Sequence, residues 1–455
     1  MAHAHYTSEQ LTERFQFLGK YRTVIFGLIG VGLVLVLASW LLTDGSEATT
    51  HAADGHAAIE SVHSPVQPVA DTHGEGDHGH ADHVPGVGTR MLTGTLISLL
   101  FFFTISMGAL FFLAVHQVGN AGWQTAIRRV PEAMSLWVPV AGVVFLILLF
   151  FLGDLYEWAI IPEGVDAIID KKRAWLNEGS FWFRTFVYFT IWIGGALVLR
   201  RLSVSQDSAA SVEDGVSFFR KSTGVAAGFI VLFAFSYSLF TFDWIKSLEP
   251  HWFSTIFGVY VFAGSFGSAM FTLGLLLTFL KRQGYMSYVN DSHIHDVYKF
   301  AFGFTVFWAY IWVSQYLLIW YSNIPEEGIY YVKRYSVGDP AYIGGSFNIV
   351  WIINLLLCFL TPFLGLMTRN AKRMAKVYIP ISILALTGHY IDIFQMVQPG
   401  ALGKYWGFGM MEIGFFLIFA GLFLFVVFTA LTRANLVPQR HPYLEESLHH
   451  TTGDV

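Results

Sequence analysis

Two titratable residues lie three positions apart in an otherwise apolar stretch of the chain. His389 and Asp392 occur in the segment LTGHYIDIFQM, and this spacing places both side chains on one face of a helix. A charged side chain within a membrane-spanning helix costs about 2.5 kcal/mol or more, so it usually faces the interior of a helix bundle. The pair is therefore a candidate for proton transfer or quinone chemistry. The alternative is a structural hydrogen-bonded pair that ties two helices together.

Further titratable residues lie near the ends of the apolar runs. Those toward the outer surface and those toward the cytoplasm would form the two halves of a proton path. For the inner residues, the alternative is that each lies near a headgroup boundary, where reaching water costs little. The outer residues are Asp154, Asp243 and Glu412, and the inner residues are His116, Glu132 and Lys281. The full set of proton-path candidates is His116, Glu132, Asp243, Glu249, Lys281, His389, Asp392 and Glu412.

The composition indicates which elements must position these residues. Hydrophobic residues make up 54% of the chain and charged residues 13%, and the mean hydropathy is +0.53. An ordinary soluble domain carries roughly a quarter charged residues, so the composition excludes a water-soluble globule. A helix needs about 20 apolar residues to cross the hydrocarbon core of a membrane, and several stretches of this chain reach that length.

The predicted fold class is an all-α integral membrane protein with ten transmembrane helices. Pro139, Pro362 and Pro380 lie within the apolar runs and are expected to mark kinks, because neighbouring helices satisfy the backbone groups that proline frees. The ten runs are Thr23–Leu42, Met91–Val115, Met134–Leu152, Phe181–Leu199, Gly224–Phe242, Phe253–Leu280, Val297–Tyr321, Phe347–Met367, Val377–Val397 and Phe408–Leu431.

Lysine and arginine predict the orientation, because cytoplasmic loops are enriched in them. The N-terminal segment and the even-numbered connections between helices hold 18 of the 27 lysine and arginine residues, and the other nine lie elsewhere. Both termini are therefore expected in the cytoplasm. The first 22 residues are polar, unlike a cleavable signal peptide, so we expect the first apolar run to remain as a helix.

Two features bear on metal chemistry. The first outer loop, Asp44 to Gly88, holds seven histidines, but its low apolar content predicts a solvated insert whose histidines bind metal only adventitiously. Cys358 is the single cysteine, which excludes a disulfide, a cysteine-ligated iron–sulfur cluster and a thioether-linked haem within this chain. We therefore predict no catalytic residue and no metal site. No basic cluster indicates nucleic acid as a partner.

Four segments carry a resemblance to a known family. They are AGWQTAIRRVPEA (121–133), DWIKSLEPHWFSTIFGVYVFAG (243–264), WYSNIPEE (320–327) and GHYIDIFQMVQP (388–399). Over nearly its whole length the chain resembles the NrfD/PsrC family of quinone-handling membrane subunits. It is more closely similar to the ActF-type subunits of bacterial alternative complex III, a quinol:cytochrome c oxidoreductase.

The resemblance implies an architecture of two four-helix bundles, helices 2–5 and helices 6–9, flanked by helices 1 and 10. The divisions that follow are a cytoplasmic segment (1–22), the first helix (23–43), a His-rich periplasmic loop (44–90), the first bundle (91–243), the second bundle (244–398), the tenth helix (399–432) and a cytoplasmic tail (433–455).

The resemblance also implies a location, partners and cofactors. The location is the bacterial inner membrane, where lipid surrounds the chain. The partners are an ActC-like paralogous quinol subunit, an iron–sulfur protein and c-type haem subunits, with a terminal oxidase as a further candidate. Menaquinol is the candidate ligand, no cofactor is bound covalently, and haem c and iron–sulfur clusters belong to the partner subunits. The chain is then not catalytic on its own.

A quinone site needs a proton acceptor and an aromatic or aliphatic slot, because quinol oxidation releases two protons and two electrons. Family analogy places quinone sites at the outer end of the first bundle. The alternative for the aromatic residues there is an anchoring belt at the membrane surface. The quinone-site candidates are Asp154, Tyr156, Trp158, Asp243 and Trp244.

Two other functions fit ten helices with buried carboxylates. A secondary transporter would have repeats with broken helices that meet at the midplane of the membrane, and the sequence shows no convincing pair of these. A purely structural membrane scaffold predicts that His389, Asp392 and Glu412 can be neutralised without loss of turnover.

Overall fold

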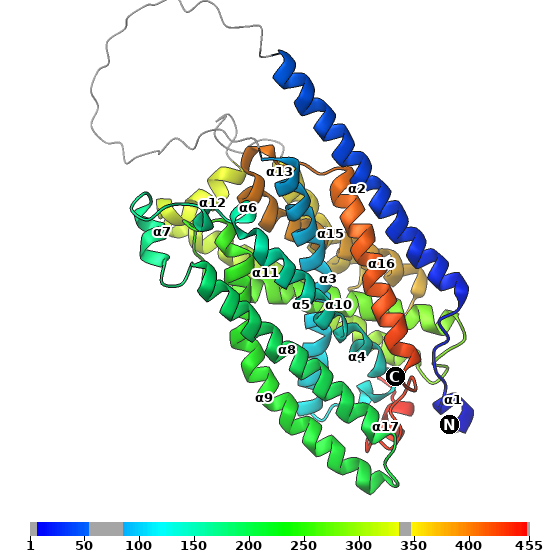
Figure 1. The fold of residues 1–455 in the computed structure, drawn as a ribbon. Coiled ribbons are helices and arrows are strands. Elements are labelled where there is room, and N and C mark those ends of the chain that lie inside the picture. The colour runs from blue at the N-terminus through cyan, green and yellow to red at the C-terminus, as the bar shows by residue number, and fades with distance from the viewer. Residues whose placement is uncertain (1–6, 54–84, 336–346, 453–455) are drawn as a thin grey trace, which may run out of the picture.

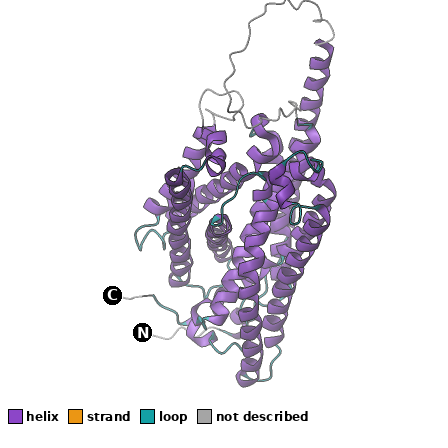
Figure 2. Cartoon of the chain, turned by 90° about the vertical axis from the view of Figure 1, so that its left-hand side faces the viewer, coloured by secondary structure: helices purple, strands orange, loops and turns teal. Residues whose placement is uncertain are grey.

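The computed structural model describes residues 7–53, 85–335 and 347–452, and every regular element within these ranges is a helix (Figures 1 and 2). Ten stretches of these residues are helical, long and apolar enough to cross a membrane, as the sequence predicted. They are α2 (Gly19–Ala53), α3 (Val87–Val118), α4 to α6 (Arg129–Leu155), α8 (Glu178–Gln206), α9 (Val212–Trp244), α10 (Phe257–Arg282), α11 (Asp291–Ser322), α13 to α14 (Phe347–Gly365), α15 (Ala375–Leu402) and α16 (Met410–Thr432).

Several segments outside the ten predicted spans contain helix. The helix α2 continues to Ala53, so the first ten residues of the predicted His-rich loop are helical. The rest of that prediction falls mainly on residues 54–84, which lie outside the described residues. The segment after Tyr321 forms the short helix α12 (Pro325–Tyr335). Hydropathy alone does not reveal such helices, because it locates apolar stretches long enough to cross a membrane and gives no signal for polar helices outside those stretches.

Two of the ten stretches are interrupted. In the third, α4 (Arg129–Ser135) is followed by α5 (Trp137–Leu148), and a 3₁₀ turn separates α5 from α6 (Leu152–Leu155). In the eighth, a π-helical segment (Leu356–Leu360) joins α13 (Phe347–Leu355) to α14 (Thr361–Gly365). Pro139 and Pro362 lie close to these breaks, whereas Pro380 lies within the continuous helix α15.

The helices α3 and α10 occupy the centre of the molecule. The most apolar stretches of α3 and α10 are 94% and 89% buried, against 22% for α2, which packs along α16 at the edge (Figure 1). At Gly108, an added Cβ atom would lie 2.5 Å from the Ser265 carbonyl oxygen and 2.7 Å from the Ala269 Cβ atom. Glycine is therefore required for the close approach of α3 to α10.

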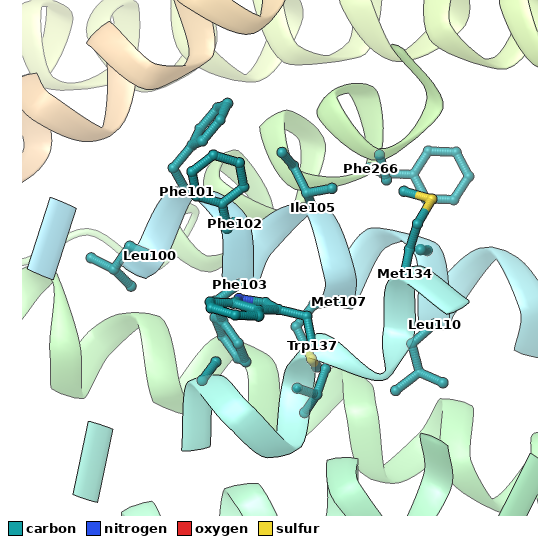
Figure 3. Close-up of a cluster of buried hydrophobic side chains, with 14 of the residues drawn as sticks. Leu100, Phe101, Phe102, Phe103, Ile105, Met107, Leu110, Met134, Trp137 and Phe266 are labelled. Carbon is teal, nitrogen blue, oxygen red and sulfur yellow. The ribbon is translucent and has the colours of Figure 1, made fainter. Parts of the chain in front are cut away.

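Eight helices contact one another in two closed series, one of which contains α3 and the other α10. In the first half, α3 and α8 each pack against both α5 and α9; in the second half, α11 and α15 each pack against both α10 and α14. Phe103 on α3 lies at the centre of the first series, within a buried apolar cluster (Figure 3). Its ring centroid is 5.1–5.6 Å from those of Phe145, Phe189, Trp192 and Phe240. Aromatic rings from four helices thus meet in one core.

The N-terminal segment and the C-terminal tail lie at the same end of the molecule (Figure 1). The backbone N–H of Leu436 donates to the Glu13 carbonyl oxygen over 2.9 Å, so the two segments are in direct contact. We call this end the terminal end. The opposite end, which carries α12 and α7 (Ala167–Lys172), is the distal end.

Candidate functional site

Asp392 on α15 is buried among three other helices of the second half. The Tyr260 hydroxyl on α10 donates to its Oδ1 atom. The Asn354 amide on α13 donates to the same oxygen over 2.9 Å, and the Trp308 indole N–H on α11 donates to Oδ2 over 3.0 Å. The side chains that bond this carboxyl group are therefore all neutral.

His389 lies one helical turn before Asp392 and is also buried. Its Nδ1 atom is 3.6 Å from the Cys358 Sγ atom, which donates to the Asn354 Oδ1 atom over 3.1 Å. Its Nε2 atom has no hydrogen-bond partner within the described part of the chain. Glycine at position 388 allows α15 to pack closely against the π-helical segment. An added Cβ atom there would lie 2.7 Å from Leu357 Cβ and 2.9 Å from the Cys358 backbone nitrogen.

Both residues line one cavity. The cavity has a volume of about 10 Å³, and the polar residues Thr104, Ser265 and Ser268 also line it. One water molecule needs roughly 10–15 Å³ measured in this way, together with polar partners. The sequence prediction that His389 and Asp392 lie on one face is confirmed, and the face they share borders a polar cavity about the size of one water molecule.

Asp392 differs from the other buried carboxylates of the described residues. Five carboxylates are buried there, and for four of them a lysine or arginine lies within ion-pair distance. These pairs are Glu132 with Arg128 and Arg129, Asp243 with Arg184, Asp296 with Lys299, and Glu412 with Arg90. Asp392 has no such cation in the part of the chain that the structure describes.

Asp243 forms a closed ion-pair cluster at the distal end. Its Oδ1 atom accepts from Trp175 Nε1 (2.8 Å) and Arg184 Nη2 (3.0 Å), and its Oδ2 atom accepts from Arg184 Nε (2.8 Å) and the Tyr188 hydroxyl (2.8 Å). The Arg184 guanidinium also lies over the Trp175 ring, 4.1 Å from its centroid. Four donors thus occupy both oxygens of this carboxylate.

The other quinone-site candidates pack beside this cluster, except for one. The Tyr156 hydroxyl donates to the Trp244 carbonyl oxygen over 2.9 Å, and the Trp158 indole donates to Ser247 over 3.3 Å. The centroids of the Tyr156 and Trp158 rings are 5.5 Å apart. Asp154 is exposed. The structure therefore groups four of the five candidates, with the hydroxyl and indole groups of Tyr156 and Trp158 bonded within the protein.

Glu249 forms a second ion pair at the distal end, with Arg334 on α12. The Arg334 guanidinium lies 3.5 Å from the centroid of the Tyr330 ring. Burial is the largest single influence on the pKa of Arg334 and lowers it, but the Glu249 carboxylate together with Tyr330 and Tyr335 raises it, so the pKa lies above its ordinary value. Trp252 stacks on Tyr330 at 4.0 Å. Two segments that carry the family resemblance, 243–264 and 320–327, thus meet through Trp252, whose indole also donates to the Glu327 carbonyl oxygen over 3.2 Å.

The other predicted proton-path residues are not joined into one path. The Glu412 carboxylate accepts from the Gly409 backbone N–H over 2.8 Å and so caps the start of α16. His116 bonds the Phe112 carbonyl oxygen over 2.9 Å, and Glu132 lies within its arginine cluster. Lys281 is partly exposed, 4.0 Å from Asp291.

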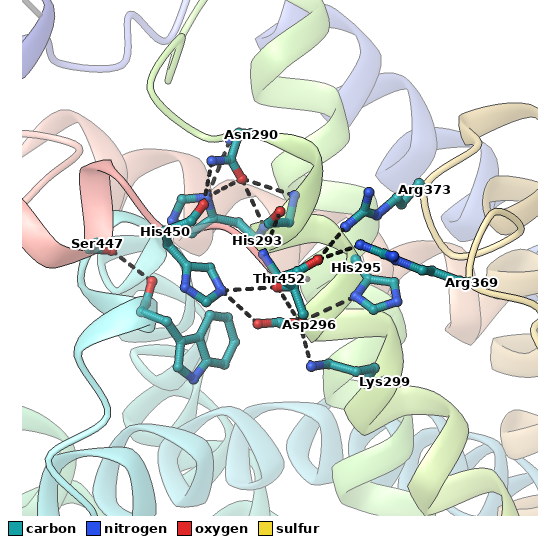
Figure 4. Close-up of polar contacts among 12 residues, drawn as sticks. Asn290, His293, His295, Asp296, Lys299, Arg369, Arg373, Ser447, His450 and Thr452 are labelled. Atoms are coloured by element: carbon teal, nitrogen blue, oxygen red, sulfur yellow. Dashed lines mark hydrogen bonds and ion pairs between the residues drawn. The ribbon is translucent and has the colours of Figure 1, made fainter. Parts of the chain in front are cut away.

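A polar cluster that the sequence prediction missed lies at the terminal end (Figure 4). The Asp296 carboxylate contacts His450 Nε2 at 2.7 Å and Lys299 Nζ at 2.6 Å, and it accepts from the Thr452 hydroxyl over 3.1 Å. Arg373 donates to the Thr452 carbonyl oxygen over 3.0 Å. These contacts hold the C-terminal tail against α11. The segment DSHIHD (291–296) was the available signal, since four titratable residues at a helix start are unusual in so apolar a chain.

No protein-family model matches the chain, and no curated protein is significantly similar to it.

Proposed function

We propose that this chain is a membrane subunit of a quinol:cytochrome c oxidoreductase of the alternative complex III type, in which it handles protons and supports a neighbouring quinol-oxidising subunit. Its ten apolar helices suit a multi-pass membrane protein. The family segments named above are the basis for the complex, and the hydrogen bond from the Trp252 indole to the Glu327 carbonyl oxygen, which joins two of them, supports treating those two as one structural feature.

In this proposal, helices 2–5 and 6–9 form two four-helix bundles across the bacterial inner membrane. The two closed series of helix contacts support this arrangement. Because the terminal end carries more of the lysine and arginine residues, we assign it to the cytoplasm. The Asp392 site then lies inside the second bundle.

The observation that carries the proposal is that no lysine or arginine among the described residues lies within ion-pair distance of Asp392. A buried carboxylate without a counter-ion is costly when ionised, whereas a paired one keeps its charge. The Tyr260, Trp308 and Asn354 donors stabilise the ionised form, so both protonation states are available to Asp392. A group of this kind can accept and release a proton, and His389 across the shared cavity is a second acceptor.

Asp243, the buried carboxylate among the quinone-site candidates, is poorly placed to accept a proton from quinol in this chain. A quinol hydroxyl needs a free acceptor oxygen, but both oxygens of Asp243 are occupied by Trp175, Arg184 and Tyr188. We therefore assign quinol oxidation to the ActC-like neighbour, and haem c and iron–sulfur clusters to the other partner subunits. This chain then contributes the scaffold and a route for protons.

Purification of the chain with its partners tests this proposal. A tagged chain extracted in mild detergent is expected to carry c-type haem absorbance and quinol-dependent reduction of cytochrome c. A chain that purifies alone, without haem, would contradict the proposed complex. Solute uptake by liposomes that contain only this chain would instead favour a secondary transporter.

A further inference from the structure

A cavity of about 340 Å³ opens at the distal end, between α7 and the end of α9. Ligand sites in proteins have volumes of roughly 300–1,000 Å³, so the cavity is large enough for a small polar group. Its lining combines three lysines with aromatic rings and one acidic residue: Lys171, Lys172, Lys246, Trp175, Phe242, Trp252 and Glu249.

The three lysines of this cavity have no ion-pair partner among the described residues, although carboxylates lie close by. Each of those carboxylates is bonded elsewhere: Asp166 to His251, Asp243 to Arg184, and Glu249 to Arg334. The Lys172 ammonium group donates to the Pro250 carbonyl oxygen, which fixes its position without neutralising its charge. Burial lowers the pKa of Lys172, and a bound anion would oppose that shift. The cavity thus has the charge of an anion-binding site.

The cavity borders an apolar surface. The Lys246 ammonium group lies 5.5 Å from the centroid of the Phe242 ring. Phe235 and Leu232 precede Phe242 on α9 at spacings of seven and ten residues, which places all three on one side of the helix. The Phe235 and Leu232 side chains are 71% and 52% exposed. An apolar track therefore runs along α9 away from the lysines.

We propose that this cavity binds the phosphate group of an anionic phospholipid, whose acyl chains lie along the track formed by Phe242, Phe235 and Leu232. The lysines provide the complementary charge, and the aromatic rings suit the boundary between headgroups and hydrocarbon. The track distinguishes a lipid from free phosphate, because free phosphate gains nothing from an apolar surface. The inference rests on the membrane-spanning arrangement proposed above and is independent of the redox and proton-handling roles.

Native mass spectrometry of the full chain, with the subunits that purify with it, tests this proposal. Phosphatidylglycerol and phosphatidylcholine with identical acyl chains are titrated onto delipidated protein. We expect at least one phosphatidylglycerol to bind more tightly than phosphatidylcholine. Near a membrane surface each lysine contributes about 1 kcal/mol, so Lys172→Gln and Lys246→Gln are each expected to weaken that binding about fivefold. Lys246→Arg should retain it.

The matched control is Lys221→Gln, an exposed lysine near the other end of α9, which should leave the selectivity unchanged. Equal binding of phosphatidylglycerol and phosphatidylcholine by the wild-type protein would by itself overturn the proposal, whatever the variants show. Competition by millimolar inorganic phosphate as effective as that by the lipid would identify a free anion as the ligand instead. Preferential binding of a neutral quinone would also contradict it. Assembly and quinol oxidation are measured separately, so their loss does not affect this result.

Discussion

Replacing Asp243 with asparagine should destabilise the protein far more than the same replacement at Asp392. The Asp243 carboxylate accepts from Arg184 Nε over 2.8 Å and from Arg184 Nη2 over 3.0 Å. Asp243→Asn replaces this carboxylate with a neutral amide. Both residues are buried, so Arg184 would become an uncompensated buried charge. Breaking a buried pair in this way costs about 3–5 kcal/mol.

Asp392→Asn leaves no charge unpaired, because its donors are the neutral Tyr260, Trp308 and Asn354 side chains. The expected cost is that of one altered neutral hydrogen bond, about 1 kcal/mol. The difference between the variants, roughly 3 kcal/mol, corresponds to more than a hundredfold in the ratio of folded to unfolded protein.

The free energy of unfolding can be measured by titrating mixed micelles with a denaturing detergent and following helix content by circular dichroism. The double variant Arg184→Gln with Asp243→Asn removes both charges and should recover part of the loss. Equal destabilisation by Asp243→Asn and Asp392→Asn would refute the reasoning from counter-ions. So would a loss below about 1 kcal/mol at Asp243.

Two further predictions concern the docking of the C-terminal tail and the orientation of the chain in the membrane. Burial, together with the Arg128 and Arg129 charges, holds the pKa of His441 in the C-terminal tail well below its ordinary value of 6.5. The neutral His441 side chain therefore stabilises the docked tail fully above about pH 6.5, and this stabilisation is lost as the pH falls below that value. Proteolysis of the tail should accelerate between pH 7.5 and 5.5 in the wild type but less in His441→Gln, and an unchanged pH dependence in this variant would contradict the assignment. For topology, an impermeant thiol reagent on intact cells should label Glu163→Cys and not Ala210→Cys, whereas the reverse pattern would invert the proposed orientation.

The sequence predicted the helices well but not their partners. Length and hydropathy suffice to locate a span, since about 20 apolar residues are needed in any fold. The partners of Asp392 could not be predicted in this way, because Tyr260 and Trp308 are 132 and 84 positions away. Helical periodicity predicts which side chains share a face, but not which helix that face meets.

The same limit applies to the ion pairs. Arg184 and Asp243 are 59 positions apart, and the sequence indicated Asp243 as a site candidate without predicting this partner. Their contact depends on α8 packing against α9. The contact between His450 and Asp296, 154 positions apart, likewise depends on the path of the tail across the terminal end.

If Asp392 exchanges protons during quinol oxidation, the number of protons that the complex releases per quinol in liposomes should depend on this carboxyl group. Asp392→Asn is compared with Tyr260→Phe, which removes a donor to the same carboxyl group but keeps the group titratable. We expect Asp392→Asn to lower the number of protons released per quinol with all subunits still bound, and Tyr260→Phe to change that number little. An unchanged proton stoichiometry and turnover in Asp392→Asn would contradict the claim and would leave His389 and Asp392 as a structural pair.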